Sequence, residues 1–406
     1  MKKRIQFVLA AVWTAMMATT LGVSALAAQE KDVRTYREGG NWVQETTGSM
    51  PSGRMLRIYS ALGSVEVRGQ DGGNTVTYKV KKVVHRSTEE EAKREWASFT
   101  VGTGRRGEWS LISGEWVGAR PRRSRMHLEY VISVPKDIST VKLETLGGSV
   151  GVYAVRGKVY AQTAGGSISS DDIGEYLGAN TLGGNIDVGR VTGEVNLNTA
   201  GGSINIGNVG GKIVAVTSGG SVQVLKGGQS VKVETAAGSI TVKECGDLWA
   251  TTAGGTIEVG DVNGWAKMET AGGAIRLNSV KGTVSAITQG GGIKLTRLTS
   301  GIQAETANGG IEAEFITAKI TESHLATTAG DIIVYLPSDI AVTIKAAIEV
   351  ANGHKIYSDF SGLKIMSEGG SYGPKQVFGE GSLNGGGPVM KVHTSNGNIY
   401  FRRLKR

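Results

Sequence analysis

Cysteine, proline and aromatic residues are scarce in this sequence of 406 residues, which has 1 Cys, 6 Pro and only 6% Phe, Trp and Tyr. The lone Cys245 excludes an internal disulfide, so packing and backbone pairing must stabilise the fold. With so little proline, the 62 glycines do not indicate collagen or a proline-rich disordered chain. Since 39% of the residues are hydrophobic, we expect a core of small and β-branched side chains.

Motifs for catalysis and ligand binding are also missing. No G-x-S-x-G elbow accompanies the five histidines, and no two histidines lie close together at metal-ligand spacing. The glycine phrases described below lead into strand-like residues rather than G-K-[ST] and a helix, which excludes a phosphate-binding loop. A Ca²⁺-binding roll would need a recurring carboxylate, but the corresponding position varies from Ser169 through Asp187 to Lys294. We therefore predict no catalytic, cofactor-binding or metal-binding residues.

Positive charge is in modest excess, with a formal net charge of +9 at pH 7. Much of it lies in two clusters, at residues 120–125 and 402–406. We interpret both as solvated faces, with contact to an anionic envelope surface as the alternative. Because no nucleic-acid-binding module is recognisable, nucleic acid is not an expected partner.

The first 27 residues have the pattern of a secretion signal. Lys2, Lys3 and Arg4 precede an apolar run that ends at Ala25-Leu26-Ala27, a small-x-small cleavage pattern. We predict a cleaved signal peptide over 1–27 and export to the periplasm, the cell surface or the medium. The alternative is an uncleaved anchor, since the run approaches the length of a spanning helix. No other segment does, so no membrane span is expected after cleavage.

A repeated T-x-G-G-x-I phrase dominates the remainder. Most of its threonines are 18 residues apart: Thr145, Thr163, Thr181, Thr199, Thr217, Thr235, Thr252, Thr270, Thr288, Thr306 and Thr328. Around each threonine, apolar residues alternate with polar ones, as in a strand with one buried face. Each unit therefore reads as two short strands, and units this small become stable by stacking.

The resulting prediction is an all-β fold, a single-stranded parallel β-solenoid (β-helix) with about 18 residues per coil. The glycines would serve as corners, through positive φ or close approach of neighbouring coils. The threonine and Cys245 have inward parity, so Cys245 is predicted to be a buried apolar residue.

The two ends of the chain depart from the repeat. We predict a β-rich N-terminal section over 28–140, with one short helix that begins at Ser87 and Glu90 in capping-box spacing. The solenoid would cover 141–335. A C-terminal capping region over 336–406 would end in a strand segment, where the phrase returns at Thr394.

The signal peptide, the stacked phrases and the closing GGGPVMKVHTSNGNIYF resemble the bacterial putative-adhesin β-strand repeat family, a domain of unknown function. The resemblance covers roughly residues 55–402. It implies a role in interactions at the envelope or outside the cell, without naming a ligand. Its motifs are turn glycines and core positions, so they are specific for architecture rather than for activity.

The outward residues are then the candidates for function. Three residues before each threonine, Tyr160, Val214 and Trp249 are apolar exceptions in an otherwise polar column, and we predict a partner surface there. Packing against the terminal sections is the alternative. The leading hypothesis is an exported non-enzymatic protein that contacts a protein or glycan. The alternatives are a carbohydrate-active β-helix enzyme, such as a polysaccharide lyase or hydrolase, and a structural, self-assembling envelope protein.

Overall fold

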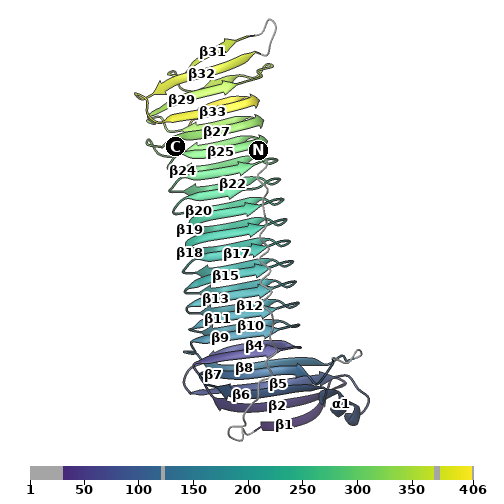
Figure 1. Cartoon of the computed structure of the whole chain (residues 1–406). Coiled ribbons are helices and arrows are strands. Elements are labelled where there is room, and N and C mark those ends of the chain that lie inside the picture. Colours follow the sequence, from purple (N-terminus) through teal and green to yellow (C-terminus); the bar gives the residue numbers. More distant parts are fainter. Residues whose placement is uncertain (1–30, 120–123, 370–374, 405–406) are drawn as a thin grey trace.

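Alternating buried and exposed residues build a long rod of stacked strands in the computed structural model (Figure 1). The structure describes residues 31–119, 124–369 and 375–404. The predicted signal peptide over 1–27 lies outside these residues. Most of the described chain is strand, with one helix, and the long sheet is largely parallel, which confirms the all-β prediction.

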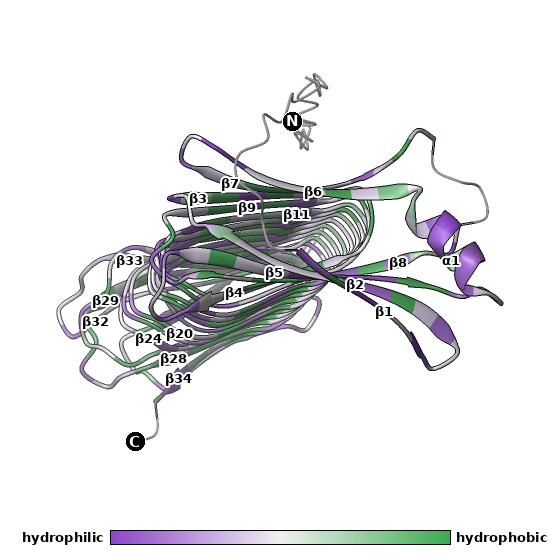
Figure 2. Ribbon diagram, turned by 90° about the horizontal axis from the view of Figure 1, so that it is seen from below, coloured by the Kyte–Doolittle hydropathy of each residue, from purple (hydrophilic) through white to green (hydrophobic). Residues whose placement is uncertain are grey.

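The rod has two facing sheets with the apolar core between them (Figure 2). The first, here called the threonine sheet, contains the strands that end in the phrase threonine. In spatial order it comprises β6 (Phe99–Arg106), β7 (Trp109–Trp116), β3 (Met55–Ser60), β9 (Thr140–Thr145), β11 (Lys158–Thr163), β13 (Tyr176–Thr181), β15 (Glu194–Thr199), β17 (Ile213–Thr217), the second half of β18 (Val222–Thr235), the second half of β19 (Ile240–Thr252), β21 (Ala266–Glu269), β23 (Val284–Thr288), β25 (Ile302–Asn308), β27 (Ser323–Ala329), β33 (Val389–Asn396), β29 (Val342–Ile348), β32 (Gln376–Leu383) and β31 (Lys364–Glu368).

The second sheet contains the strands that follow the glycines. In spatial order it comprises β1 (Lys31–Glu38), β2 (Asn41–Pro51), β5 (Thr75–Val84), β8 (His127–Pro135), β4 (Ser64–Gln70), β10 (Val150–Val155), β12 (Ile168–Ile173), β14 (Ile186–Val191), β16 (Ile204–Val209), the first halves of β18 and β19, β20 (Ile257–Val262), β22 (Ile275–Val280), β24 (Ile293–Leu298), β26 (Ile311–Phe315), β28 (Ile332–Leu336), β34 (Ile399–Arg403) and β30 (Ile356–Ser358).

The register places like residues above one another. Thr163 pairs with Thr181, and Ile168 pairs with Ile186. The threonine side chains are buried in this column, and Cys245 is buried at the position that Val262 takes in the next coil, as predicted. Towards the N-terminus the column ends at Ser60, which pairs with Thr145 and bonds to the hydroxyl of Tyr130 at 2.9 Å.

The glycine of each corner that lies three residues after the threonine is required by close approach. A Cβ on Gly184 would lie 2.1 Å from the carbonyl oxygen of Gly166 in the preceding coil. The preceding glycine is looser, because a Cβ on Gly183 would be 3.8 Å from its nearest neighbour. Positive φ, the other reason we expected, occurs in this corner column only at Gly63, Gly148, Gly309 and Gly330 among the described residues.

Two local predictions were wrong. The eleventh threonine in the buried column is Thr327, not Thr328, because Leu325 is buried and the alternation then turns Thr327 inward and leaves Thr328 exposed. The helix α1 (Glu89–Trp96) is capped by Thr88, whose hydroxyl accepts from the Glu91 N–H at 3.3 Å, and not by Ser87.

The C-terminal strands do not stack in chain order. After β28 the chain forms β29 to β32 and then returns as β33 and β34, which pair with β27 and β28. Consequently β33 lies between β27 and the earlier strand β29. Thr394 of β33 bonds to the Gly330 carbonyl at 3.2 Å and so extends the threonine column by one more coil.

Candidate interaction surface

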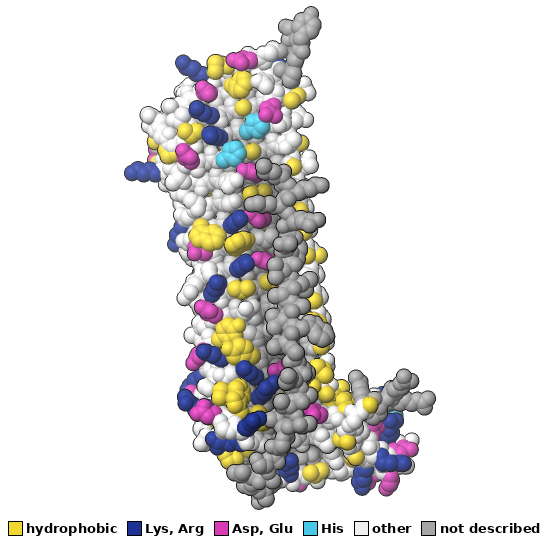
Figure 3. All heavy atoms as spheres, viewed as in Figure 1, with side chains coloured by type: hydrophobic (Ala, Val, Ile, Leu, Met, Phe, Trp, Pro, Cys, Tyr) yellow, Lys and Arg dark blue, Asp and Glu magenta, His cyan; other side chains and the backbone are white. Residues whose placement is uncertain are grey.

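The predicted partner residues lie on the outer face of the threonine sheet, in one column of aligned positions. This outer column contains Lys142, Tyr160, Gly178, Asn196, Val214, Lys232, Trp249, Lys267, Ser285 and Gln303. Figure 3 views this face and shows hydrophobic side chains in separate clusters, with basic and acidic side chains between them. The column is therefore a series of separate apolar positions rather than a continuous apolar strip.

Trp249 is held between two lysines. Its side chain is 39% exposed, and the Nζ atoms of Lys232 and Lys267 lie 5.1 and 5.0 Å from the ring centroid. Each ammonium also forms an ion pair on its own strand, with Glu234 at 3.0 Å and with Glu269 at 2.9 Å. Cation–π contacts at exposed sites are worth about 0.5–1 kcal/mol each, so the indole is fixed before any partner arrives.

Tyr160 belongs to a second cluster, near the N-terminal end of the rod. Its ring is 40% exposed and lies 5.4 Å, centroid to centroid, from the ring of Tyr176. The Nζ of Lys142 lies 5.5 Å from the Tyr160 ring and 5.6 Å from the Trp109 ring of the N-terminal section. Tyr160 thus contributes both to the outer face and to packing near the N-terminal strands.

Val214 is half-buried between Asn196 and Lys232. At roughly 4.8 Å per strand, it lies about 14 Å from Tyr160 and about 10 Å from Trp249 along the column. The structure therefore places the three predicted residues on one face but does not bring them into contact. Each lies in a polar or cationic setting of its own.

Most of the chain matches a known protein family. The sequence model described as Toastrack DUF4097 matches residues 54–264 and again residues 226–400. The chain belongs to the Toastrack DUF4097 family. This membership confirms the resemblance to an uncharacterised putative-adhesin β-repeat family. Among curated proteins no sequence matches the chain significantly.

Three solved structures are similar to this Toastrack chain. A putative cell adhesion protein from Clostridium sporogenes has 10% identity and a TM-score of 0.18, and the alignment covers 93% of this chain and 100% of that one. A putative adhesin from Bacteroides fragilis has 11% identity and a TM-score of 0.27, with 62% and 96% covered. A putative adhesin from Parabacteroides distasonis has 12% identity and a TM-score of 0.25, with 69% and 96% covered.

Two outward-facing aromatic residues of the threonine sheet were missed by sequence reasoning, the half-buried Tyr176 and the exposed Trp265. Tyr176 and Trp265 face outwards five residues before their threonines, next to the outer column, and the Trp265 side chain is 41% exposed. They have the same outward parity as the outer column, so a search of all outward positions would have found them. Together with Tyr160 and Trp249 they widen the aromatic surface to two adjacent columns.

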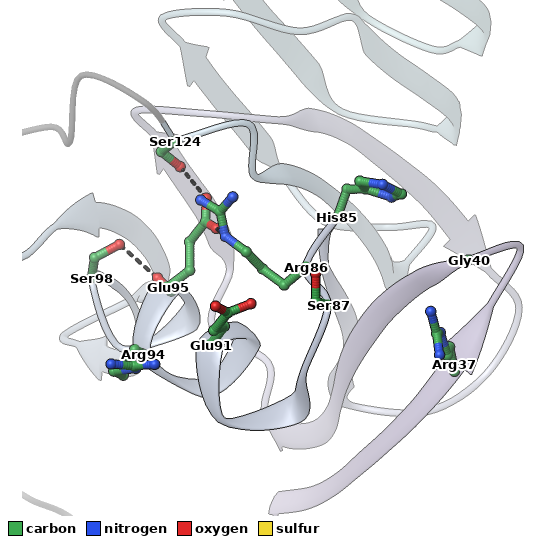
Figure 4. Close-up of a pocket in the computed structure, with 10 residues that line it drawn as sticks. All are labelled: Arg37, Gly40, His85, Arg86, Ser87, Glu91, Arg94, Glu95, Ser98 and Ser124. Atoms are coloured by element: carbon green, nitrogen blue, oxygen red, sulfur yellow. Dashed lines mark hydrogen bonds and ion pairs between the residues drawn. The ribbon is translucent and has the colours of Figure 1, made fainter.

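A depression lies beside α1 in the N-terminal section (Figure 4). It has a volume of about 780 Å³, and Arg37, Arg86, Glu91 and Arg94 are among its lining residues. Glu95 pairs with Arg86 at 2.7 Å and accepts from the Ser124 hydroxyl at 2.7 Å. Figure 4 shows Arg37 and Arg94 on opposite sides of the depression, so its cations do not converge on one point. Residues 120–123 of the predicted basic cluster lie outside the described residues.

Three further features bear on ligand binding and on membranes. In the part of the chain that the structure describes, no group of three or more His, Cys, Asp or Glu residues is placed to hold a metal ion. No helix among these residues is long and apolar enough to span a membrane. Arg402 and Arg403 of the second basic cluster both bond to Asp359, through an ion pair at 3.1 Å and a backbone N–H at 3.0 Å.

Proposed function

We propose that this chain is an exported, non-enzymatic β-solenoid with coils of about 18 residues, whose threonine sheet contacts a protein or a glycan at the cell envelope or outside the cell. The segments predicted from the sequence are part of the proposal: a signal peptide over 1–27, an N-terminal section over 28–140, a solenoid over 141–335 and a cap over 336–406. The aligned pairing of Thr163 with Thr181 and of Thr181 with Thr199 supports the coil length.

The observation that carries the proposal is the Trp249 indole between Lys232 and Lys267. Trp and Tyr are the residues most enriched where binding energy is concentrated. A side chain already held in place loses little entropy when a partner packs on it. Glu234 and Glu269 balance the two lysines, which favours a partner without strong charge.

A binding screen with a paired variant tests the contact surface. The full chain would be applied to a glycan array and to a panel of extracellular matrix proteins, beside the double variant Tyr160→Ser, Trp249→Ser. Tyr357→Ser is the matched control, because Tyr357 is an equally exposed aromatic residue (40%) on the second sheet. We expect the double variant to weaken binding about tenfold or more, and the control to bind like the wild type.

Unchanged binding by the double variant would contradict the proposed surface. Export is tested separately, by fractionating cells that carry the tagged chain: a cytoplasmic pool without signal cleavage would refute it. Light scattering on the purified chain addresses self-assembly. A monomer at all concentrations is expected. Association of rods through Trp249 would instead indicate that the partner of the contact surface is a second copy of this chain.

A further inference from the structure

The second sheet carries a groove that no part of the proposed contact surface uses. It has a volume of about 580 Å³ and runs across the outer face from β10 to the first half of β19. Gly189 and Gly207 lie on its floor, where other coils have larger side chains such as Tyr153 and Leu225. The Asp171 carboxylate lies beside Gly189, with its Oδ1 2.2 Å from where a Cβ on that glycine would be. Tyr153 lines the groove at one end, and Leu225 and Lys243 line it towards the other.

A ladder of polar side chains forms one wall of the groove. Asp187, Asn205 and Gln223 are aligned across three adjacent strands. The Nδ2 of Asn205 donates to Oδ1 of Asp187 at 2.7 Å, which fixes both side chains. A carboxylate has about four lone-pair positions, and an amide both donates and accepts, so the ladder retains capacity for further hydrogen bonds.

The ends of the groove are apolar or aromatic. Leu225 is 47% exposed. Its neighbours on the adjacent strands are Gly207 and Lys243, so no hydrophobic side chain lies beside it in this column. At the other end Tyr153 is half-buried, with the Arg68 guanidinium 5.2 Å from its ring centroid. Small-molecule sites combine hydrophobic and aromatic surface with a small number of precisely placed polar groups. This groove contains both kinds of group.

The groove has few charged side chains, and two of them already accept hydrogen bonds from neighbouring residues. Asp171 accepts from the Arg190 N–H at 2.7 Å, Asp187 is bonded to Asn205, and Lys243 lies at the far end. A polyanion would find one ammonium and two carboxylates, so an acidic polymer is disfavoured. Hydroxyl groups match the ladder better, because they both donate to Asp187 and accept from Asn205 or Gln223.

The direction of the groove favours a glycan over a peptide as the ligand. Extended peptides bind sheets mainly by adding to an unpaired edge, but Asn205 of the ladder is on a strand that is paired on both sides, with Asp187 and with Gln223 as neighbours. A ligand lying across the strands meets one polar side chain about every 4.8 Å. That spacing suits one pyranose ring per coil, with its apolar face against Leu225 or Tyr153.

We infer that this groove binds a neutral glycan chain along the axis of the rod, with Asp187, Asn205 and Gln223 contacting its hydroxyl groups. The inference names a partner class within the proposed extracellular role and rests on that role only for access to glycans. It uses a different sheet from Tyr160 and Trp249, so the two sites can fail separately.

The test is titration of the full chain with neutral hexasaccharides of β-1,4-glucose, β-1,4-N-acetylglucosamine, β-1,3-glucose and mannose. An acidic polyuronate and an extended peptide serve as comparison ligands. The double variant Asn205→Leu, Gln223→Leu removes two amides of the ladder. Its matched control is Asn263→Leu, Asn278→Leu, which removes two exposed amides that belong neither to the groove nor to the threonine sheet. We expect binding of at least one neutral oligosaccharide, weakened about tenfold or more in the groove variant and unchanged in the control.

Three results would overturn the inference: no neutral oligosaccharide binds, only the polyuronate or the peptide binds, or the groove variant binds like the wild type. If binding is lost instead in Tyr160→Ser, Trp249→Ser, the contact surface is supported and the groove is not. Release of new reducing ends from a bound oligosaccharide would support the groove and contradict the non-enzymatic function.

Discussion

The hydroxyl of Thr181 donates to the carbonyl oxygen of Gly166 in the preceding coil, at 2.8 Å. The hydroxyl oxygen of Thr181 also accepts from the N–H of Gly184 in its own corner, at 3.3 Å. Each phrase threonine therefore links two consecutive corners while its methyl group packs inside. The link recurs along the rod, for example from Thr199 to Gly184 at 2.8 Å and from Thr327 to Gly309 at 2.9 Å.

Replacing a column threonine by valine should break this link with little change in volume. In Thr199→Val the carbonyl of Gly184 and the N–H of Gly202 lose their partner in a buried corner. A buried polar group without a partner costs about 1–3 kcal/mol, so the free energy of unfolding in urea should fall by at least that amount. Thr199→Ser keeps the hydroxyl and should cost about 1 kcal/mol, for one buried methyl group. Equal losses in the two variants would show that the hydrogen bonds are unimportant.

The two glycines of a corner should respond differently to alanine. A Cβ on Gly202 would lie 2.0 Å from the Gly184 carbonyl oxygen, whereas a Cβ on Gly201 would be 3.6 Å from its nearest neighbour. We expect Gly202→Ala to lower the free energy of unfolding by about 1–3 kcal/mol or more, through overpacking. Gly201→Ala should remain close to wild type. Thermal unfolding followed by circular dichroism gives both values, and similar melting curves for the two variants would contradict close approach as the reason for glycine.

Natural variation between the coils already shows that the looser position tolerates residues other than glycine. Four coils carry another residue at the looser glycine position, namely Ala237, Asn308, Ala329 and Asn396, whereas the tighter position is glycine in every coil of the column. The repeat could therefore be predicted from the sequence, because one physical requirement is repeated at a fixed spacing. Thr327 and Thr88 could not, since each has a neighbour of the same chemistry and only the buried Leu325 or the helix geometry decides between them.

The candidate surfaces were harder to predict than the fold. Trp249 was singled out by its parity, but the two lysines that hold it are fixed by the register and by rotamers that the sequence does not specify. The groove was missed because the position of Asp187 was examined only for recurring or clustered carboxylates. The neighbouring Gly189 and Gly207, which line the groove, have the appearance of ordinary corner glycines in the sequence.

Lys82 should make stability depend on pH in the mildly alkaline range. Burial lowers the pKa of its ammonium to about 8, while Nζ donates to the carbonyls of Phe99 at 2.6 Å and Trp96 at 3.1 Å. Between pH 8 and the unfolded value near 10.4 the unfolded chain holds more protons, so this group makes stability rise with pH. Lys82→Met should remove that rise. Urea unfolding at pH 7.5 and 9.5 measures it as the difference between the two proteins, because all other titrating groups are common to both. Parallel pH dependences would refute the assignment.

The thiol of Cys245 should be unreactive in the folded rod. Its side chain is buried in the core column beside Val262, and burial raises the pKa of the thiol to about 12. The thiolate is the reactive form, so at pH 8 a disulfide reagent should not label the native chain on a timescale of minutes. One thiol per chain should react once the protein is unfolded in guanidinium. Labelling should speed up in Gly202→Ala if that variant loosens the stack, whereas Gly201→Ala should leave the rate unchanged. Rapid labelling of the native wild type would mean that the core opens at this coil and would contradict the packed column.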